Sequence, residues 1–576
     1  MAAAAPRPSA PRRRGLGLIP LVGVLRSYDR RWLRGDVIAG IAVAALIIPK
    51  NLGYAGIAGI PLQNGLYAAA VGAILYAVFG TCRQISMGPS SGLAAVAASA
   101  VLTAGLVDPA QVAVFVAGIT LVSGLLFLIL AIARMSWVAR FLSRAVVTGF
   151  LFGAAIDVVI GELPKLTGTE ATGSNALREM WSWLSSVPQA HGLTLLVGLV
   201  ALVVVFGLRR LRPGVPGALV LVVGGLLANW AFGLADRGVA IVGDIPSGLP
   251  RFSSPDVGLL VEHAGTVFAA AVALLLIGFS QTAGDARAFA AKHNYQIDIN
   301  QESVAQALAN TGAGLFQGMP VSTSLSASSL NDHSGARTGL ASIVSGVTVL
   351  LALLFLAPLF AGLPKPVLAA LIIEAVVMGM MDVAEMRRLA RVQRFDFWIA
   401  MVAIVATLLV GVLAGVVIGV VLSLLWLIAV TTHPQLPELG RQHGTTAYRD
   451  VSAHPEDELD PGVAVLRIDS GLFFASCEAV EDRTRDLIHG RPELRGLVLD
   501  CAGVNFIDSQ GTAQVAAIAR LTREAGLELQ LARVKSTVAA VLDRDGFFDL
   551  IGRDHLHGNV DQAVGMIRRG GGPWAD

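Results

Sequence analysis

Long apolar stretches recur along most of this sequence and constrain its fold more than any other feature. From Asp36 to about Val430 they alternate with short polar joints. Because a helix needs about 20 apolar residues to cross a bilayer, the pattern predicts roughly fourteen spans. The clear spans are 36–58, 65–80, 109–133, 142–163, 191–208, 215–235, 259–282, 336–360, 364–381, 396–411 and 413–431. Three other segments, around 87–106, 298–317 and 319–332, are shorter or more polar than a lipid-exposed helix should be.

The composition agrees with lipid as the main solvent. Apolar residues make up 54% of the 576 residues and charged residues 15%, below the roughly 25% of a soluble domain. The net charge is +2 and no basic block is interleaved with aromatics, which excludes nucleic acid as a partner. Cys82, Cys477 and Cys501 fit neither a disulfide framework nor a metal site. With no catalytic triad, metal spacing or phosphate loop visible, we expect neither enzyme activity nor a cofactor.

Both ends of the chain lie outside the predicted membrane domain, 34–431. Residues 1–33 predict a basic tail and an interfacial helix, without the cleavage site of a signal peptide. If the N-terminus is cytoplasmic, the joints that carry most of the Lys and Arg residues also face the cytoplasm, as the positive-inside rule requires. We therefore expect a multi-pass protein of the cell membrane with both termini cytoplasmic.

The C-terminal part has the pattern of a soluble domain. Pro, Gly and acidic residues predict a linker over 432–461. Over 462–570, short apolar runs alternate with helical patterns, which indicates a largely parallel sheet covered by helices. The expected strands are 463–468, 496–500 and 527–532, and the expected helices are 477–489, 509–525, 535–543 and 560–569.

Two of the short membrane segments open alike, one in each half of the sequence. Gly88 to Gly92 precedes an apolar run, and Met319 to Ser324 precedes a serine-rich one. Interruptions at corresponding places in two halves mark the substrate site of an inverted-repeat transporter. A half-helix that starts inside the membrane presents unpaired N–H groups and a positive dipole end, so two facing starts would form an anion cradle. The residues expected at this cradle are Gly88, Ser90, Ser91, Ser322, Ser324 and Ser326. Kinked helices packed by small residues remain the alternative.

Several motifs then resemble one family. The stretch from Asn64 through Cys82-Arg83 to Gly88-Pro89 resembles the signature of the SulP family of sulfate permeases and related anion transporters. Val498-Leu499-Asp500 and the run from Val504 to Gly511 resemble a STAS domain, the usual C-terminal partner in that family. Further matching pieces are Ile48 to Ala55, Ala286 to Ala290, Asn300 to Glu302, Gly335 to Thr338 and Leu363 to Lys365. Together the motifs cover about residues 34 to 569.

The resemblance implies an α-helical membrane domain of 14 spans, built as two inverted repeats of seven, plus an α/β STAS domain. It implies a core domain from spans 1–4 and 8–11 that moves against a gate domain from spans 5–7 and 12–14. The substrate is expected between the facing ends of spans 3 and 10, flanked by spans 1 and 8. A homodimer is the expected assembly.

Lys50 departs from the family pattern, which often has Gln after this proline. The lysine stands near the middle of the first span in a chain that otherwise favours Arg. A central lysine costs about 2.5–3.5 kcal/mol on insertion scales and is usually functional. Span 10 has Ser326-Ala327 where relatives often carry Ser-Arg, so Lys50 would replace that charge. The alternative is a lysine that snorkels or pairs with an acid.

Acidic residues in the spans are candidates for coupling transport to a cation. Gln281 stands where relatives often place a carboxylate, and Asp285 follows one turn later on the same face. Asp285 would bind H+ or Na+, or else pair with Arg287 or Lys292 at the helix end. Asp157 and Glu374 lie in the corresponding spans 5 and 12 and either form part of a proton route or hydrogen-bond within the gate.

Two smaller expectations concern a tyrosine and the soluble domain. Tyr54, one turn after Lys50, is either a wall of the site or packed between helices. In STAS domains that act as phosphorylation switches two serines follow the aspartate, whereas here Asp508 is followed by Ser509 and Gln510. Either residue can cap a helix instead of serving regulation. A cytosolic partner of the domain stays open.

The function expected from these patterns is secondary transport of a small inorganic anion, sulfate or bicarbonate first, by anion exchange or with H+ or Na+ coupling. A carboxylate or nucleobase permease of the same fold would need side chains that recognise a ring or a second carboxylate. A passive anion channel or a membrane sensor is the alternative from another class, and uptake against a gradient would separate it from a transporter.

Overall fold

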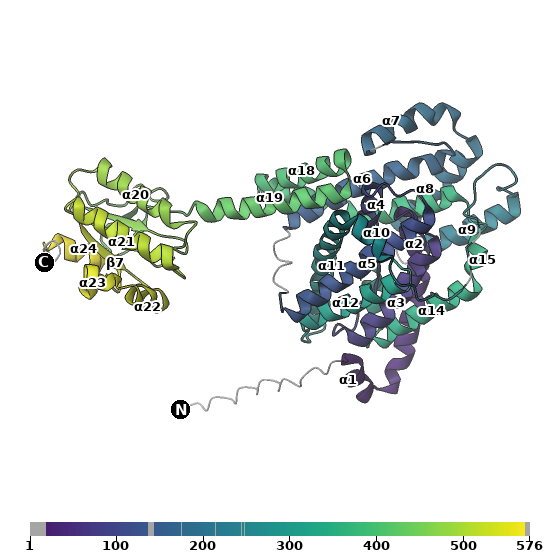
Figure 1. The fold of residues 1–576 in the computed structure, drawn as a ribbon, viewed down its shortest axis with the longest axis horizontal. Helices are drawn as coiled ribbons and strands as arrows, with labels where there is room; N and C mark the ends of the chain where they lie inside the picture. The colour runs from purple at the N-terminus through teal and green to yellow at the C-terminus, as the bar shows by residue number, and fades with distance from the viewer. Residues whose placement is uncertain are drawn as a thin grey trace. The chain divides into compact units, whose positions relative to one another are not determined.

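The computed structural model describes residues 19–135, 143–173, 175–212, 215–243, 245–246 and 248–570. It divides into two compact units, Met1–Ser423 and Leu424–Asp576, whose elements are labelled in Figure 1. Helix α1 (Pro20–Arg26) and the short η1 (Arg30–Trp32) precede the first long helix. The expected basic tail lies outside the described residues up to position 18, and α1 occupies the place expected for the interfacial helix.

The first unit contains two runs of seven helices. The last helix of the second run extends past Ser423 into the second unit. The first run is α2 (Leu33–Ile57), α3 (Leu62–Phe79), α4 (Ser91–Thr103), α5 (Pro109–Ile132), α6 (Arg144–Thr167), α8 (Gly192–Leu211) and α9 (Gly217–Phe232). The second run is α11 (Ala264–Lys292), α12 (Ile299–Leu315), α13 (Leu325–His333), α14 (Leu340–Phe355), α16 (Lys365–Met380), α18 (Arg394–Val410) and α19 (Val412–Thr432). Shorter helices α7 (Ala176–Ser186), α10 (Val257–Glu262), α15 (Ala357–Phe360) and α17 (Val383–Val392) connect them.

The packing of these helices repeats when each helix is replaced by the one seven places later. Helix α5 packs on α12 as α14 packs on α3, and α6 packs on α18 as α16 packs on α8. Likewise α4 packs on α11 as α13 packs on α2. In the described residues, eight helical segments are long and apolar enough to cross a membrane, and α4, α9 and α14 are shorter apolar helices. The contacts are those of two interlocked repeats of seven spans.

Small residues let the helices approach closely. A Cβ at Gly149 of α6 would lie 2.4 Å from the Ala400 carbonyl oxygen of α18, so only glycine fits there. Such contacts are the usual basis of helix packing in lipid, where burial from water gives no force between helices. We call α2–α5 and α11–α14 the core helices, and α6, α8, α9, α16, α18 and α19 the gate helices.

The second unit contains a four-stranded parallel sheet. Its strands are β5 (Val463–Arg467), β6 (Gly496–Asp500), β7 (Glu528–Ala532) and β8 (Leu556–His557), in that order. Its helices are α20 (Cys477–Gly490), α21 (Ser509–Glu524), α22 (Ser536–Arg544), α23 (Phe547–Ile551) and α24 (Val560–Arg568). Alternate side chains of β5 enter two different apolar clusters, as the pleat of a strand requires. One cluster contains residues of α20 to α23, and the other contains residues of α24.

The segment expected as a linker contains a hairpin. Strands β3 (Leu439–Arg441) and β4 (Tyr448–Asp450) pair antiparallel. Glu438 also pairs with Leu466 of β5, so this segment extends the sheet at its β5 edge. Strand β8 and helix α23 are further elements that the sequence patterns did not predict.

Candidate functional site

A short strand pair places the two broken segments side by side. Strand β1 (Met87–Pro89) pairs antiparallel with β2 (Val321–Thr323), with Gly88 opposite Ser322. Helix α4 begins just after β1 and α13 just after β2. Because each strand is only roughly 10 Å long and the pair is antiparallel, the two helices start close together and run apart.

Serine hydroxyls cap both half-helices. The Ser90 Oγ accepts a hydrogen bond from the Leu93 amide at 3.5 Å, and the Ser324 Oγ accepts one from the Ala327 amide at 3.5 Å. Each hydroxyl satisfies one of the free N–H groups of a first helical turn. The other N–H groups of these turns keep the positive end of the helix dipole available to an anion.

A cavity of about 660 Å³ adjoins both half-helix starts. On the core side, residues from α2, α4, α11 and α13 line it, and on the gate side residues from α6, α8 and α16 do. Its polar and charged lining consists of Lys50, Tyr54, Ser90, Ser91, Arg144, Arg209, Gln281, Asp285, Thr323, Ser324, Ser326, Ser329 and Glu374. Most of the predicted site residues therefore share one cavity.

Lys50 enters this cavity and forms no salt bridge with a carboxylate of the described residues. Its Nζ donates to the Ser326 Oγ at 3.4 Å, in the first turn of α13. Among the described residues no carboxylate lies within 4.0 Å of that ammonium. The ammonium therefore sits beside the positive end of α13, an arrangement that a negatively charged ligand would stabilise.

Helix α11 holds the other side of the α13 start. The Gln281 Oε1 accepts a hydrogen bond from the Ser322 hydroxyl, and the Asp285 Oδ2 accepts one from the Thr323 Oγ1 at 2.7 Å. Asp285 is not ion-paired with Lys292, whose Nζ lies 2.7 Å from Asp332. The Asp285 carboxylate is thus hydrogen-bonded to Thr323, the residue that precedes the N-cap of α13.

The gate wall of the cavity carries an ion pair. The Arg209 guanidinium of α8 lies 2.6 Å from the Glu374 carboxylate of α16. The Glu374 side chain is only 8% exposed, whereas that of Arg209 is 48% exposed. Sequence reasoning found Glu374 but missed Arg209, Arg144 and Thr323, because both arginines lie near helix ends and resemble loop charges. The signal available was Glu374 itself, since a carboxylate inside a membrane domain needs a cation.

Three of the residues predicted for the membrane domain lie outside the cavity lining. Gly88 and Ser322 are buried in the strand pair and do not line the cavity. Their backbones pair with each other in the strands that precede the two half-helices. Asp157 is on α6 and is also absent from the cavity lining, so no geometry connects it with Lys50 or Asp285.

Comparison with known proteins gives the family. The model of the sulfate permease family matches residues 33–403 of this chain. The chain belongs to that family. A second model, that of the STAS domain, matches residues 454–563. The family is one of transporters, which agrees with the expectation of no enzyme activity.

Relatives of this sulfate permease family member include a Mycobacterium tuberculosis protein named "Probable sulfate transporter MT1781". It is 33% identical over 96% of this chain and 98% of its own length. "Sulfate transporter 4.1, chloroplastic" of Arabidopsis thaliana is 29% identical over 95% of this chain and 82% of its own. These proteins support the same family assignment over nearly the whole chain.

Solved structures show the same fold. The murine Slc26a9 anion transporter in its inward-facing state superposes with a TM-score of 0.87 at 21% identity, covering 98% of this chain and 96% of its own. The transmembrane domain of the cyanobacterial bicarbonate transporter BicA gives a TM-score of 0.60 at 22% identity, over 68% of this chain and 98% of its own. The predicted fold class of paired seven-span repeats with a C-terminal STAS domain is confirmed.

The two residues named in the STAS domain lie at the start of helix α21. Asp508 is the N-cap of α21, where its Oδ1 accepts from the Gly511 amide at 2.8 Å. Its Oδ2 accepts from the Phe474 amide at 3.1 Å. Ser509 is the first residue of α21 and is exposed. Asp508 therefore joins two loops at one edge of the domain.

Proposed function

We propose that this protein is a secondary active transporter of a small inorganic anion, with sulfate as the first expected substrate and bicarbonate the second. One observation carries the proposal: two capped half-helix starts and the ammonium of Lys50 adjoin a single cavity between core and gate helices. Helix dipoles, hydroxyl groups and one ammonium suit a compact anion without a ring. The names of the curated relatives support sulfate.

Transport in this proposal follows from the two sets of helices. An anion held at the start of α13 contacts mainly core helices, while Arg209 and Glu374 belong to the gate. Movement of the core helices against the gate helices would carry the anion from one side of the membrane to the other. The excess of Lys and Arg in alternate joints supports a cytoplasmic location for both termini in the cell membrane.

The proposal is tested by uptake of labelled sulfate, bicarbonate and chloride into proteoliposomes, with and without pH and sodium gradients. We expect accumulation against the anion gradient, which a channel or sensor cannot produce. Lys50→Gln should lower initial uptake about tenfold or more, because a charge-assisted contact to the anion is lost. Lys365→Gln removes an exposed lysine outside the cavity and should transport like wild type. Unchanged uptake in Lys50→Gln would overturn the assignment of the site.

We further propose that Asp285 couples uptake to H+ or Na+. Its support is geometric: the carboxylate lines the cavity and binds Thr323, directly before the cap of α13. A cation bound there would stabilise the α13 start in the arrangement that holds the anion. Asp285→Asn should still bind sulfate but lose the dependence of uptake on the cation gradient, while Asp236→Asn in an exposed loop should keep it. Wild-type uptake that ignores both cations would contradict this role.

A further inference from the structure

One face of the STAS sheet is covered by few elements. Val463 and Val465 of β5 point away from the larger apolar cluster and enter a smaller one. In the described residues, the rest of that cluster comes from the neighbouring strands β6 and β7, from the hairpin β3–β4 with Leu439, and from helix α24 with Val564. Between hairpin and helix lies a cavity of about 310 Å³ whose floor is formed by Leu439, Val463, Val465 and Val564.

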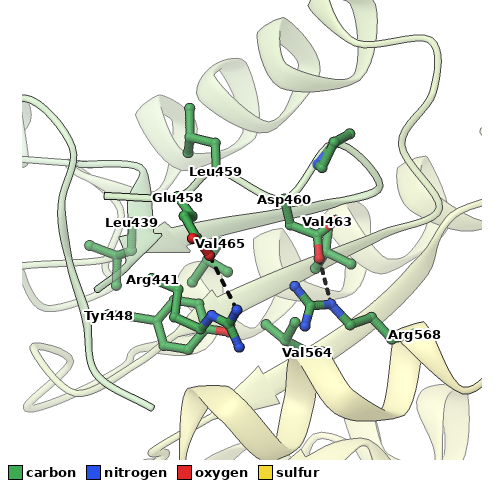
Figure 2. A pocket seen from close by; sticks show the side chains of 11 residues that line it. Leu439, Arg441, Tyr448, Glu458, Leu459, Asp460, Val463, Val465, Val564 and Arg568 are labelled. Carbon is green, nitrogen blue, oxygen red and sulfur yellow. Dashed lines mark hydrogen bonds and ion pairs between the residues drawn. The ribbon is translucent and has the colours of Figure 1, made fainter. Parts of the chain in front are cut away.

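Two arginines and a tyrosine surround this apolar floor. Figure 2 shows the guanidinium groups of Arg441 and Arg568 turned toward one another across the cavity, beside the ring of Tyr448. Arg441 is bound to Glu458 at 3.2 Å through a terminal nitrogen, and Arg568 is bound to Asp460 at 2.6 Å through Nε. Each acid therefore occupies only one edge of its guanidinium, which has five N–H donors.

Two residues that line the cavity have polar atoms without a partner among the described residues. Within the described part of the chain, the Arg441 Nε and the Tyr448 Oη are buried and have no hydrogen-bond partner. A buried donor without an acceptor costs about 1–3 kcal/mol. Burial raises the pKa of the Tyr448 phenol above its usual 10.0, so the hydroxyl stays protonated and is a donor at neutral pH. Both groups would be satisfied by one acceptor placed between the arginines.

We propose that this cavity binds a small organic anion, with its apolar body on the valine and leucine floor and its carboxylate or phosphate group between Arg441, Arg568 and Tyr448. A bare inorganic anion would leave the floor uncovered, and a neutral molecule would leave the donors unpaired. The site is formed by the hairpin that precedes the sheet and by the last helix of the domain. A bound anion therefore ties the start of the STAS unit to its end.

The test uses the purified full chain in detergent and two soluble probes, benzoate and phenyl phosphate. Amide hydrogen exchange is followed in residues 435–451 and 560–568, and binding of radiolabelled benzoate is measured by equilibrium dialysis. Inorganic phosphate and benzyl alcohol serve as the probes that lack the apolar body or the charge. Exchange in these two segments separates binding here from binding in the membrane cavity.

We expect saturable protection of both segments by benzoate or phenyl phosphate. Arg568→Gln should weaken the affinity for these anions about tenfold. Tyr448→Phe, which keeps the ring but removes the hydroxyl, should weaken it about threefold. Arg520→Gln removes an exposed charge of α21 outside the cavity and should leave the affinity unchanged. If Arg568→Gln unfolds the domain, the loss of affinity in Tyr448→Phe still tests the proposed site.

Three results would overturn the proposal. The first is an absence of protection by both organic anions at about 10 mM, a concentration that a specific site of even weak affinity would fill. The second is equal protection by inorganic phosphate, which would remove the role of the floor. The third is equal protection by benzyl alcohol, which would remove the role of the arginines.

Discussion

The two half-helices of the membrane domain have equivalent starts but different surroundings. Helix α4 has 13 residues, most of them buried, and it packs on the gate helices α6 and α16 as well as on core helices. Helix α13 has 9 residues, three of them buried, and its main helix contact is with the core helix α2. The cavity is lined by more residues of the α13 start than of the α4 start.

Close contacts show that the α4 start is held by the gate. A Cβ at Gly92 would lie 2.8 Å from a methyl group of Leu151 in α6, and one at Gly379 of α16 would lie 3.6 Å from the Ser91 Oγ. At the matching position of α13, Ser326 is exposed and contacts Lys50 instead. The repeat thus supplies two similar helix N-termini, of which one is packed against the gate and the other is open to the cavity.

The largest loss of stability is expected at the gate wall of the cavity, opposite the start of α13. Arg209→Gln removes the ion-pair partner of the buried Glu374 carboxylate and should lower the stability of the membrane domain by about 3 kcal/mol. Glu374→Gln should cost less, because Arg209 is half exposed and reaches water. The double variant should recover more than half of the loss. Thermal unfolding in detergent measures all three.

The control for that experiment is an exposed ion pair. Arg553→Gln breaks the contact with Asp543 in the STAS unit, where both side chains are well exposed, and should cost under about 1 kcal/mol. Strictly additive losses in the Arg209 and Glu374 variants would show that the two residues do not act as a pair. The gate wall opposite α13 would then owe its stability to other contacts.

The next effect concerns the packed half-helix. Gly379→Leu places a side chain against Ser91 and should obstruct the contact between α4 and α16. Overpacking of this kind costs about 1–3 kcal/mol, and Gly379 also lines the cavity, so we expect sulfate uptake to fall about tenfold and sulfate binding to weaken as well. Uptake and equilibrium binding are measured on the same preparations.

Gly207→Leu is the matched control for Gly379→Leu. Gly207 is on the gate helix α8, and a Cβ there meets no atom within 4 Å. Its leucine variant should transport like wild type. If Gly379→Leu also did so, the packing of α4 on the gate would not take part in transport, and the difference between the two half-helices would have no consequence for the cycle.

The core wall of the site was accessible from the sequence for a physical reason. Proline and glycine interruptions and a lone lysine in a span are each costly in a membrane, so their presence indicates a use, and a serine at each interruption is a residue that caps a helix start. Lys50, Ser90 and Ser324 were placed at the cavity by such reasoning. Gly88 and Ser322 lie in the strand pair beside the cavity, an arrangement that no pattern indicated, because a strand of three residues is too short to give an alternating pattern.

The gate wall was much less accessible. Arg209 and Glu374 are 165 residues apart in the sequence, and nothing local identifies one as the partner of the other. Arg209 stands near the end of α8, where a basic residue is ordinary. Only the packing of α8 on α16 brings it into the cavity. The linker hairpin likewise depends on pairing with β5, which no local pattern specifies.

The smallest expected effect is a difference in sulfate affinity between variants that lack the Ser324 cap and the Ser90 cap. Ser324→Ala removes the cap of the open half-helix and should cost about 1 kcal/mol there, which corresponds to roughly fivefold weaker sulfate binding. Ser90→Ala removes the equivalent cap of α4, but contacts with α6 and α16 hold that helix start in place. We therefore expect its sulfate affinity to fall by less than about twofold.

Ser143→Ala is the control for both cap variants. Ser143 caps the gate helix α6 by accepting from the Val146 amide at 3.2 Å and does not line the cavity. Its loss should lower stability without changing sulfate affinity, as isothermal titration of the detergent-solubilised protein can show. Equal affinity losses in Ser90→Ala and Ser324→Ala would mean that the anion contacts both half-helices alike, so that packing against the gate does not weaken the contribution of α4.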